Sequence, residues 1–322
     1  MGNRSFKFDN WKALLIILMV FGHFLEISSP LFQENPIYKF IYLFHMPCFI
    51  YINGYFSKFS FKKVAYLSIV YLLFQFIFYF FRIFVLKEKI ETIFIIFAMP
   101  YWILWYIFTL IIYTFITPLL KTKSHLKMII IITLSIIISL SSGFIPNGYV
   151  LSISRTLSFL PFFVIGYYFK NMNLEKFFNK LNVNIVNYII TGILISIFII
   201  FQDNYTSQIL YGSYSYTAMN YGLIEKSYII LTAFSFILLF NNIFSKINFK
   251  IKGISQIGKY TLPIYILHAF IVKLVSNIDI NPYFNIFISL YFSIFICFIF
   301  GNNFFNYLFV IINPFRKSKL NK

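Results

Sequence analysis

Long apolar runs separated by short polar stretches dominate the chain. A helix needs about 20 apolar residues to cross the hydrocarbon layer of a bilayer. Ten runs approach this length, and they predict ten membrane-spanning helices over residues 11–29, 37–56, 64–84, 102–120, 128–144, 157–169, 185–201, 228–243, 260–274 and 283–311. The sixth and ninth are short. The tenth is long enough to tilt strongly or to break at Gly301-Asn302-Asn303.

Basic residues are concentrated in alternate segments between these runs. Six such segments hold 20 of the 27 lysines and arginines, beside only Asp9 and Glu175. They are Arg4, Lys7, Lys12, Lys58, Lys62, Lys63, Lys121, Lys123, Lys127, Lys170, Lys176, Lys180, Lys246, Lys250, Lys252, Lys259, Arg316, Lys317, Lys319 and Lys322. Cytoplasmic loops carry an excess of basic residues. The alternation therefore predicts an even number of spans with both termini in the cytoplasm.

The composition excludes a soluble globular protein. Hydrophobic residues make up 60% of the chain and charged residues only 11%, with a mean hydropathy of +0.81, whereas soluble domains carry about 25% charged residues. The fold class predicted is an all-α integral membrane protein. The net charge of +18 is spread over short loops, which fits membrane topology rather than nucleic-acid binding. Abundant Ile, Phe, Asn and Lys beside four arginines indicate an AT-rich bacterial genome, and hence a plasma-membrane location.

No loop is long enough for a soluble domain, so we expect one membrane domain over residues 1–322. The first apolar run contains Lys12 and His23 and lacks a clear cleavage site, which predicts a retained helix rather than a signal peptide. Residues 202–226 form the longest external segment and are rich in Tyr, Ser, Asn and Gln. The segment is either a solvated connector or part of a rim that faces carbohydrate.

Metal, redox and soluble-hydrolase chemistry find no support in the motifs. Cys48 and Cys297 lie inside apolar runs, far apart, and are interpreted as packing residues. No phosphate-binding glycine loop, HExxH or GxSxG occurs. No metal and no tightly bound cofactor are therefore predicted.

Ionisable residues within spans are costly and are candidates for function. Lys12 and His23 are eleven positions apart. This separation returns them to within roughly 20° of one helix face, about 16 Å apart along the axis. Lys12 is then at the cytoplasmic mouth and His23 lies deep, towards the outer side. Each alone is compatible with a structural role, Lys12 as a snorkelling anchor and His23 as a packing hydrogen-bonder. The pair on one face favours function.

The second run contains His45 two residues before Pro47, and then Asn53. His45 either satisfies a backbone group freed by the proline or serves a site. Asn53 precedes Gly54, and close helix packing is the favoured interpretation there.

Three further polar residues complete the candidates. Arg82 and Arg155 lie at the outer ends of the third and sixth runs, where they either anchor helices or form a cationic outer pocket with His23 and His45. His268 shares a helix face with Thr261 and Tyr265 in the ninth run. That stripe either faces water or protein, or holds helices together.

Five motifs in order resemble the acyltransferase 3 family of membrane O-acyltransferases, especially the branch similar to fucose 4-O-acetylases and polysaccharide O-acetyltransferases. The resemblance extends over residues 8–314. Its carriers are Asp9-Asn10-Trp11-Lys12 through Gly22-His23, Phe44-His45-Met46-Pro47-Cys48-Phe49 running to Asn53-Gly54-Tyr55-Phe56, Trp105-Tyr106-Ile107, Phe159-Leu160-Pro161-Phe162-Phe163 with Gly166-Tyr167, and Gly258-Lys259-Tyr260-Thr261-Leu262-Pro263-Ile264-Tyr265 with His268.

The resemblance implies transfer of an acyl group, usually acetyl, from cytoplasmic acyl-CoA to a hydroxyl of a cell-surface or exported carbohydrate. Acyl-CoA, carbohydrate and membrane lipid are the partners it implies. His23 is then general base or a transiently acylated nucleophile, and Lys12 attracts the acyl-CoA phosphates. The residues His45, Asn53, Arg82, Arg155 and His268 orient the acceptor or polarise the thioester carbonyl.

The chain departs from the family pattern in three places. Lys12 replaces the usual Arg, Asn53 replaces the usual Ser, and a pair of arginines near the third run is reduced to Arg82. The esterase-like domain of some relatives is not expected, so the acceptor would meet the membrane domain or a separate partner. A role in polysaccharide export, or as a sensor or scaffold, remains the alternative.

Overall fold

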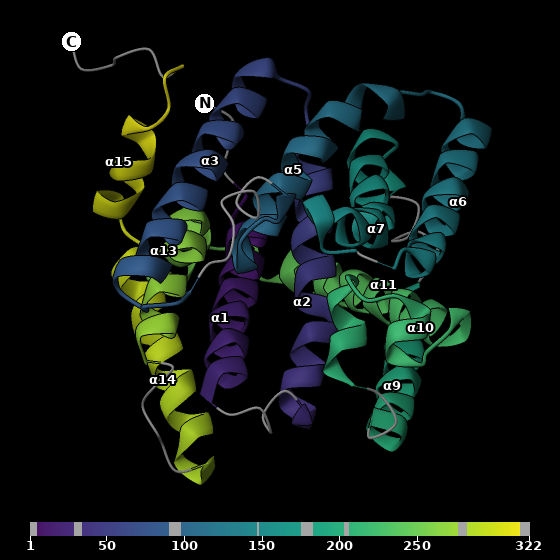
Figure 1. Cartoon of the computed structure of the whole chain (residues 1–322). Helices are drawn as coiled ribbons and strands as arrows, with labels where there is room; N and C mark the ends of the chain where they lie inside the picture. Colours follow the sequence, from purple (N-terminus) through teal and green to yellow (C-terminus); the bar gives the residue numbers. More distant parts are fainter. Residues whose placement is uncertain are drawn as a thin grey trace.

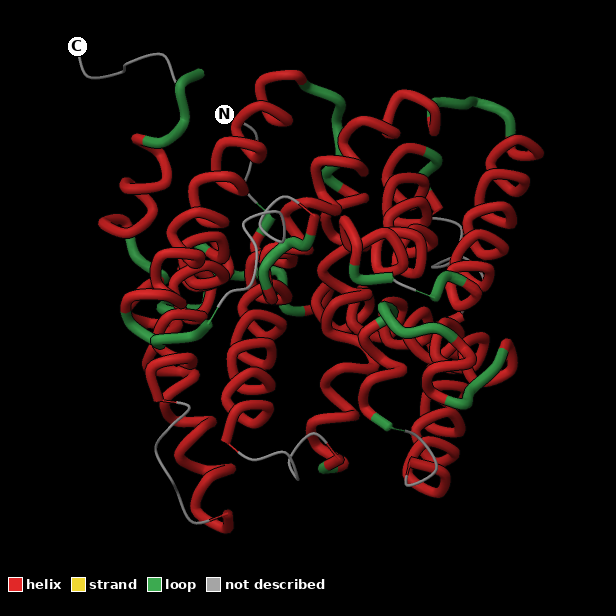
Figure 2. The backbone as a smooth tube through the Cα atoms, in the orientation of Figure 1, coloured by secondary structure: helices red, strands yellow, loops and turns green. Residues whose placement is uncertain are grey.

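The computed structural model describes residues 5–28, 34–89, 98–146, 148–174, 183–202, 206–275 and 282–315. Within these ranges the chain is helical, and Figure 2 shows no strand there. The longer helices are α1 (Phe6–Ser28), α2 (Pro36–Tyr55), α3 (Phe61–Phe84), α5 (Trp105–Ile116), α6 (His125–Ser141), α7 (Ile153–Asn171), α9 (Val183–Phe201), α11 (Leu223–Lys246), α13 (Thr261–Val275), α14 (Pro282–Phe300) and α15 (Asn303–Ile311). The prediction of an all-helical fold is confirmed for these residues.

Shorter elements extend or join the long helices. They are the 3-10 helices η2 (Trp102–Leu104), η3 (Thr117–Leu120), η4 (Ser142–Phe144), η5 (Val150–Ser152) and η7 (Ser207–Tyr211), and the helices α10 (Tyr216–Met219) and α12 (Ile254–Lys259). The elements η2, α5 and η3 together cover residues 102–120, the range predicted for the fourth span.

Side-chain caps explain where several helices begin. Asn35 caps α2 through the Ile37 amide, and Pro36 occupies the first turn, where its missing N–H costs nothing. Ser60 and Ser124 cap α3 and α6 in the same way. Asn302 caps α15 directly after α14 ends. The predicted break at Gly301-Asn302-Asn303 is therefore confirmed, and the two helices meet at an angle of 60°.

Among the described residues, six helical segments are long and apolar enough to cross a membrane, or seven if α14 and α15 count as one bent span. They correspond to α1, α3, α5, α6, α7 and α11 with their flanking turns. The helices α9 and α13 are apolar but shorter, and α2 is not among the six. Most residues of α2 are buried by other helices, so it needs no apolar surface towards lipid. The expected ten spans remain a prediction.

The ends of the helices gather as the charge alternation requires. Figure 1 shows the α2–α3 loop, the η3–α6 loop and the end of α15 on one side, and the start of α2, the end of α9 and the start of α14 on the other. Hydrogen bonds also join segments that the charge pattern assigns to the same side. The amide of Asn10 donates to the carbonyls of Ile247 and Phe249, and the hydroxyls of Ser57 and Thr117 bond each other. The grouping is compatible with cytoplasmic termini, although the membrane orientation itself stays a prediction.

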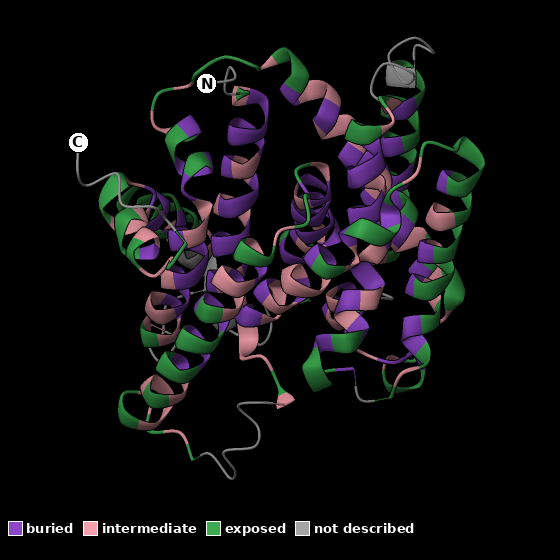
Figure 3. Cartoon of the chain, turned by 90° about the horizontal axis from the view of Figure 1, so that it is seen from above, coloured by how far each residue is buried: buried purple, intermediate pink, exposed green. Residues whose placement is uncertain are grey.

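The core is centred on α1 and α2. In the most apolar 18-residue stretch of α1, 72% of the residues are buried. The corresponding stretch of α6, at the periphery, is 28% buried. Figure 3 shows buried residues where helices face one another and exposed residues around the outside. Two glycines bring α2 and α7 together, because a Cβ at Gly54 would overlap the Phe163 carbonyl and one at Gly166 would overlap the Tyr51 carbonyl. This contact fixes α2 and α7 as neighbouring walls of the site.

Candidate active site

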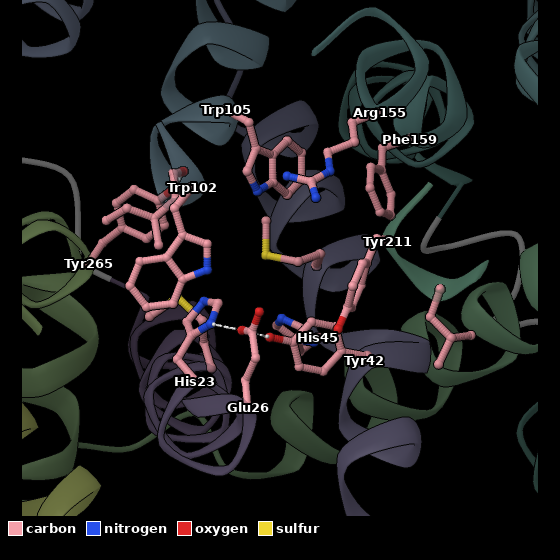
Figure 4. A pocket seen from close by; sticks show the side chains of 14 residues that line it. His23, Glu26, Tyr42, His45, Trp102, Trp105, Arg155, Phe159, Tyr211 and Tyr265 are labelled. Carbon is pink, nitrogen blue, oxygen red and sulfur yellow. Dashed lines mark hydrogen bonds and ion pairs between the residues drawn. The ribbon is translucent and has the colours of Figure 1, made fainter. Parts of the chain in front are cut away.

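His23 lies on α1 next to a carboxylate from the following turn. Its Nδ1 is 2.9 Å from Oε2 of Glu26, and the Tyr42 hydroxyl lies 3.2 Å from the same nitrogen and 3.3 Å from the same oxygen. A carboxylate on one imidazole nitrogen selects the tautomer that carries its proton there. Nε2 then keeps its lone pair, and no described residue hydrogen-bonds it. The arrangement therefore presents a basic nitrogen to a ligand (Figure 4).

Aromatic rings hold the imidazole of His23 in place. Trp102 meets it edge-on with ring centroids 4.7 Å apart, and His268 stacks on it at 5.4 Å. The Nζ of Lys273 lies over the indole ring of Trp102, 4.9 Å from its centroid. His268 is fully buried, and its Nδ1 donates to the Ile264 carbonyl at 3.0 Å. His268 thus supports His23 from behind rather than lining the pocket in front of it.

A central pocket opens in front of His23. Its walls come from α1, α2, η2, α5, α7, η7 and α13. The polar and aromatic residues that line it include His23, Glu26, Tyr42, His45, Trp105 and Arg155. His45 is buried, and its Nδ1 donates to the Ile41 carbonyl at 2.8 Å. His45 thus bonds a backbone carbonyl, but not the Leu43 carbonyl that Pro47 leaves without its helical donor. It also borders the pocket, and a role for it in the chemistry stays a prediction.

Arg155 forms the wall of the central pocket opposite His23 and Glu26, as Figure 4 shows. Its guanidinium lies over the rings of Trp105 and Tyr149, at 5.1 and 5.4 Å from their centroids. Its Nε is buried and has no hydrogen-bond partner among the described residues. Among the described residues, Arg155 is held at the pocket by aromatic contacts.

An inner pocket adjoins the central one. It is lined by Lys12, Asn53, Phe56, Tyr106 and Thr261, and it shares Met19, Met46 and Tyr265 with the central pocket. Lys12 forms an ion pair with Asp9 at 3.3 Å, and the Asn53 amide donates to Phe49 at 2.9 Å and to the Tyr106 hydroxyl. Lys12 thus lines the inner pocket and His23 the central pocket, and the two pockets share walls. This fits the spacing of the two residues, which predicted that they lie on one face of the helix.

An outer pocket adjoins the central one from the opposite direction. It is lined by Gln75, Arg82, Tyr101, Tyr149, Gln208 and Tyr214, and it shares Glu26, Trp102, Arg155 and Tyr211 with the central pocket. Arg82 pairs with Glu88 at 2.5 Å. Arg82 and Arg155 thus line this outer pocket together with Glu26, whereas His23 and His45 line the adjoining central pocket. A cationic outer site formed by these four residues stays a prediction.

Residues 206–226 fold against the helices instead of forming a solvated connector. Ser207 and Ser213 are buried, and Tyr211 and Tyr214 line the outer pocket. The Tyr211 hydroxyl also bonds that of Tyr38 at 2.6 Å. This part of the longest external segment is a wall of the site, and its role towards carbohydrate stays a prediction.

The chief residue that the sequence analysis missed is Glu26. It follows His23 by three positions and so lies on the same helix face, which is the signal that could have found it. Trp102 and Tyr42 were missed as well, and they carry no distinguishing signal in a chain with 25 tyrosines and 46 phenylalanines.

Comparison with known families agrees with this geometry. A model of the acyltransferase 3 family, described as an acyltransferase domain, matches residues 6–311. The chain belongs to this family. The match includes the helices that surround the three pockets. Together with the apolar helices, it identifies a multi-pass membrane acyltransferase.

Two curated proteins are similar over a short stretch. The nodulation proteins NolL of Sinorhizobium fredii and Mesorhizobium japonicum are 43% and 42% identical to the chain over 60 residues. That stretch is 17% of this chain and 16% of each relative. No solved structure matches the chain.

Proposed function

We propose that the protein transfers an acetyl group from acyl-CoA, bound from the cytoplasmic side, to a carbohydrate hydroxyl presented from the other side. The observation that carries this proposal is the series of three pockets that share walls, with His23 in the middle one. A donor and an acceptor that approach from opposite sides meet there. The family membership supports the acyl-transfer chemistry.

The donor occupies the inner pocket in this proposal. Lys12 attracts the phosphates of acyl-CoA, and the largely apolar walls between Lys12 and Met46 accept the acyl-pantetheine arm. The acyl group then reaches the central pocket past Met19, Met46 and Tyr265, which border both pockets.

His23 acts on the acceptor hydroxyl. Its Nε2 takes the hydroxyl proton while the oxygen attacks the thioester carbonyl, and Glu26 stabilises the imidazolium that forms. The C–S bond then breaks, and the proton passes from His23 to the departing thiolate of CoA. Transient acylation of His23 by the thioester is the other route, and it uses the same nitrogen.

The test uses purified protein in detergent with acetyl-CoA and a panel of simple glycosides. We expect acetyl-CoA-dependent formation of O-acetylated sugar, and we expect His23→Ala to reduce the rate on the order of 10²-fold or more, because general base catalysis contributes that much. Cys297→Ala, distant from the pockets, is the matched control. Full activity of the His23→Ala protein would remove His23 from catalysis.

Export of polysaccharide is separated from this proposal in cells. Loss of a transferase leaves the polymer exported but unmodified, whereas loss of an exporter leaves polymer inside the cell. Internal accumulation in a deletion strain would contradict the proposed function.

A further inference from the structure

Arg155 differs from the other charged residues of the central and outer pockets. Glu26 is bonded by His23 and Tyr42, and Arg82 is paired with Glu88. Within the described part of the chain, Arg155 contacts no carboxylate, and its Nε lacks any hydrogen-bond partner. The side chain is half-buried, and its Nε is shielded from water without any acceptor to replace the water. A buried donor left without an acceptor is unfavourable. A ligand that brings a negative group to Arg155 would offset that cost.

Neighbouring phenols do not supply the missing charge. Burial raises the pKa of Tyr211 to about 12. Burial also raises the pKa of Tyr214. Both side chains are therefore neutral at physiological pH, and they offer Arg155 no anion.

The position of Arg155 shows where such a group would lie. Arg155 belongs to both the central and the outer pocket, so a ligand in either space reaches it. It lies across the central pocket from His23 and Glu26 (Figure 4). Its guanidinium lies over the rings of Trp105 and Tyr149, and cation–π contacts of this kind use none of its N–H groups. A planar guanidinium binds carboxylate and phosphate through two parallel hydrogen bonds.

We infer that the acceptor carbohydrate carries an oxyanion, a carboxylate or a phosphate, that binds Arg155 on the side of the sugar away from the acetylated hydroxyl. This inference rests on the proposed function and specifies the class of acceptor. Trp105 and Tyr149 position Arg155, and Arg155 selects the charged acceptor. His23 deprotonates the hydroxyl at the other side of the pocket.

The experiment compares binding and transfer for three matched probes, namely a neutral methyl glycoside, the corresponding uronic acid glycoside and the corresponding sugar 1-phosphate. Calorimetry without acyl-CoA measures binding to the wild-type protein and to Arg155→Gln. We expect the wild-type protein to prefer a charged probe by about 10- to 100-fold, as for hydrogen bonds to charged groups. The preference should disappear in Arg155→Gln, while binding of the neutral glycoside changes little.

Two further variants sharpen the comparison. Arg155→Lys keeps the charge but not the planar fork, so it should retain part of the preference. Lys89→Gln removes an exposed cation that lines none of the three pockets, and it should leave the ratio of charged to neutral binding unchanged. The probe that binds better, uronide or 1-phosphate, identifies which oxyanion is recognised.

The outcomes separate this inference from the proposed function. Equal binding of charged and neutral probes to the wild-type protein would overturn the inference. An equal loss for all probes in Arg155→Gln would also overturn it, because Arg155 would then contact a part of the sugar that the three probes share. Selective binding of a charged probe without any acyl transfer would contradict the proposed function but leave the anion site in place.

Discussion

His23 acquires its chemistry from three neighbours. Glu26 selects the tautomer, Tyr42 bonds both groups, and Trp102 holds the ring edge-on. The pairing of Glu26 with His23 resembles the carboxylate–histidine part of a hydrolase triad, in which the carboxylate orients the ring and stabilises its protonated form. In the proposed mechanism the pair, rather than the histidine alone, acts on the acceptor hydroxyl.

Replacement of Glu26 by Gln tests this pair. The amide keeps the shape of the side chain but loses the charge that stabilises the imidazolium. We expect kcat to fall on the order of 10²-fold, with little change in the KM for acetyl-CoA, because Glu26 does not line the inner pocket. Steady-state kinetics on the purified variant measure both constants.

Glu88→Gln provides the control, since that carboxylate pairs with Arg82 and not with His23. It should lower kcat far less than Glu26→Gln. An unchanged kcat in Glu26→Gln would mean that the carboxylate does not assist His23.

At the scale of elements, close contact between α2 and α7 shapes the site. Gly54 and Gly166 allow the two backbones to touch, which places His45 of α2 and Arg155 of α7 on the same pocket. Contacts of this kind take the place of hydrophobic burial between helices in lipid, where apolar surface alone gives little driving force. The relative position of α2 and α7 therefore depends on two small residues.

Gly54→Ala should destabilise the protein. The added Cβ would overlap the Phe163 carbonyl, and overpacking of this type costs about 1–3 kcal/mol. We expect the apparent unfolding temperature in detergent to fall on the order of 5 °C. Thermal unfolding followed by intrinsic fluorescence is the measurement.

Gly192→Ala is the matched control, because a Cβ at that exposed position of α9 meets nothing within 4 Å. Alanine is better than glycine in a helix by about 0.5–1 kcal/mol, so the unfolding temperature should stay the same or rise. Similar destabilisation by both variants would show that close packing of α2 against α7 is not the reason for the loss of stability in Gly54→Ala.

At the scale of the molecule, the three pockets connect the two sides of the bundle through His23. The side with Lys12 also contains Asn10 with its bonds to residues 247 and 249, and the other side contains Arg82 and residues 206–214. In the proposed function, the donor and the acceptor would enter from opposite sides and meet in the central pocket.

The orientation in the membrane can be tested by cysteine labelling. On a background with Cys48→Ala and Cys297→Ala, Lys89→Cys should react with a membrane-impermeant maleimide in intact cells. Ser124→Cys should react only after permeabilisation, because its loop is predicted to be cytoplasmic. Both positions are exposed in the structure. Labelling with the opposite pattern would reverse the assignment of sides, and the background protein without added cysteine should remain unlabelled.

The sequence alone indicated most of the helical segments, offered a break before α15 as one of two possibilities, and named Lys12, His23 and Arg155 as candidates. These features are local. A bilayer excludes polar groups, so run length, capping residues and costly charges can be recognised one segment at a time. The number of spans is harder to predict from the sequence. A helix such as α2, which other helices enclose, does not need to be apolar along its whole length.

Only the tertiary structure decided which side chains meet. The pairing of His23 with Glu26 had a signal in the three-residue spacing, but the arrangement of Trp102, His268 and Tyr42 around them did not. The sequence also could not show that the Nε of Arg155 lacks a partner among the described residues, because that depends on where the nearby acceptors lie in space. Helix packing sets these distances, and packing follows from the shapes of facing surfaces, which the pattern of apolar and polar positions along the chain does not specify.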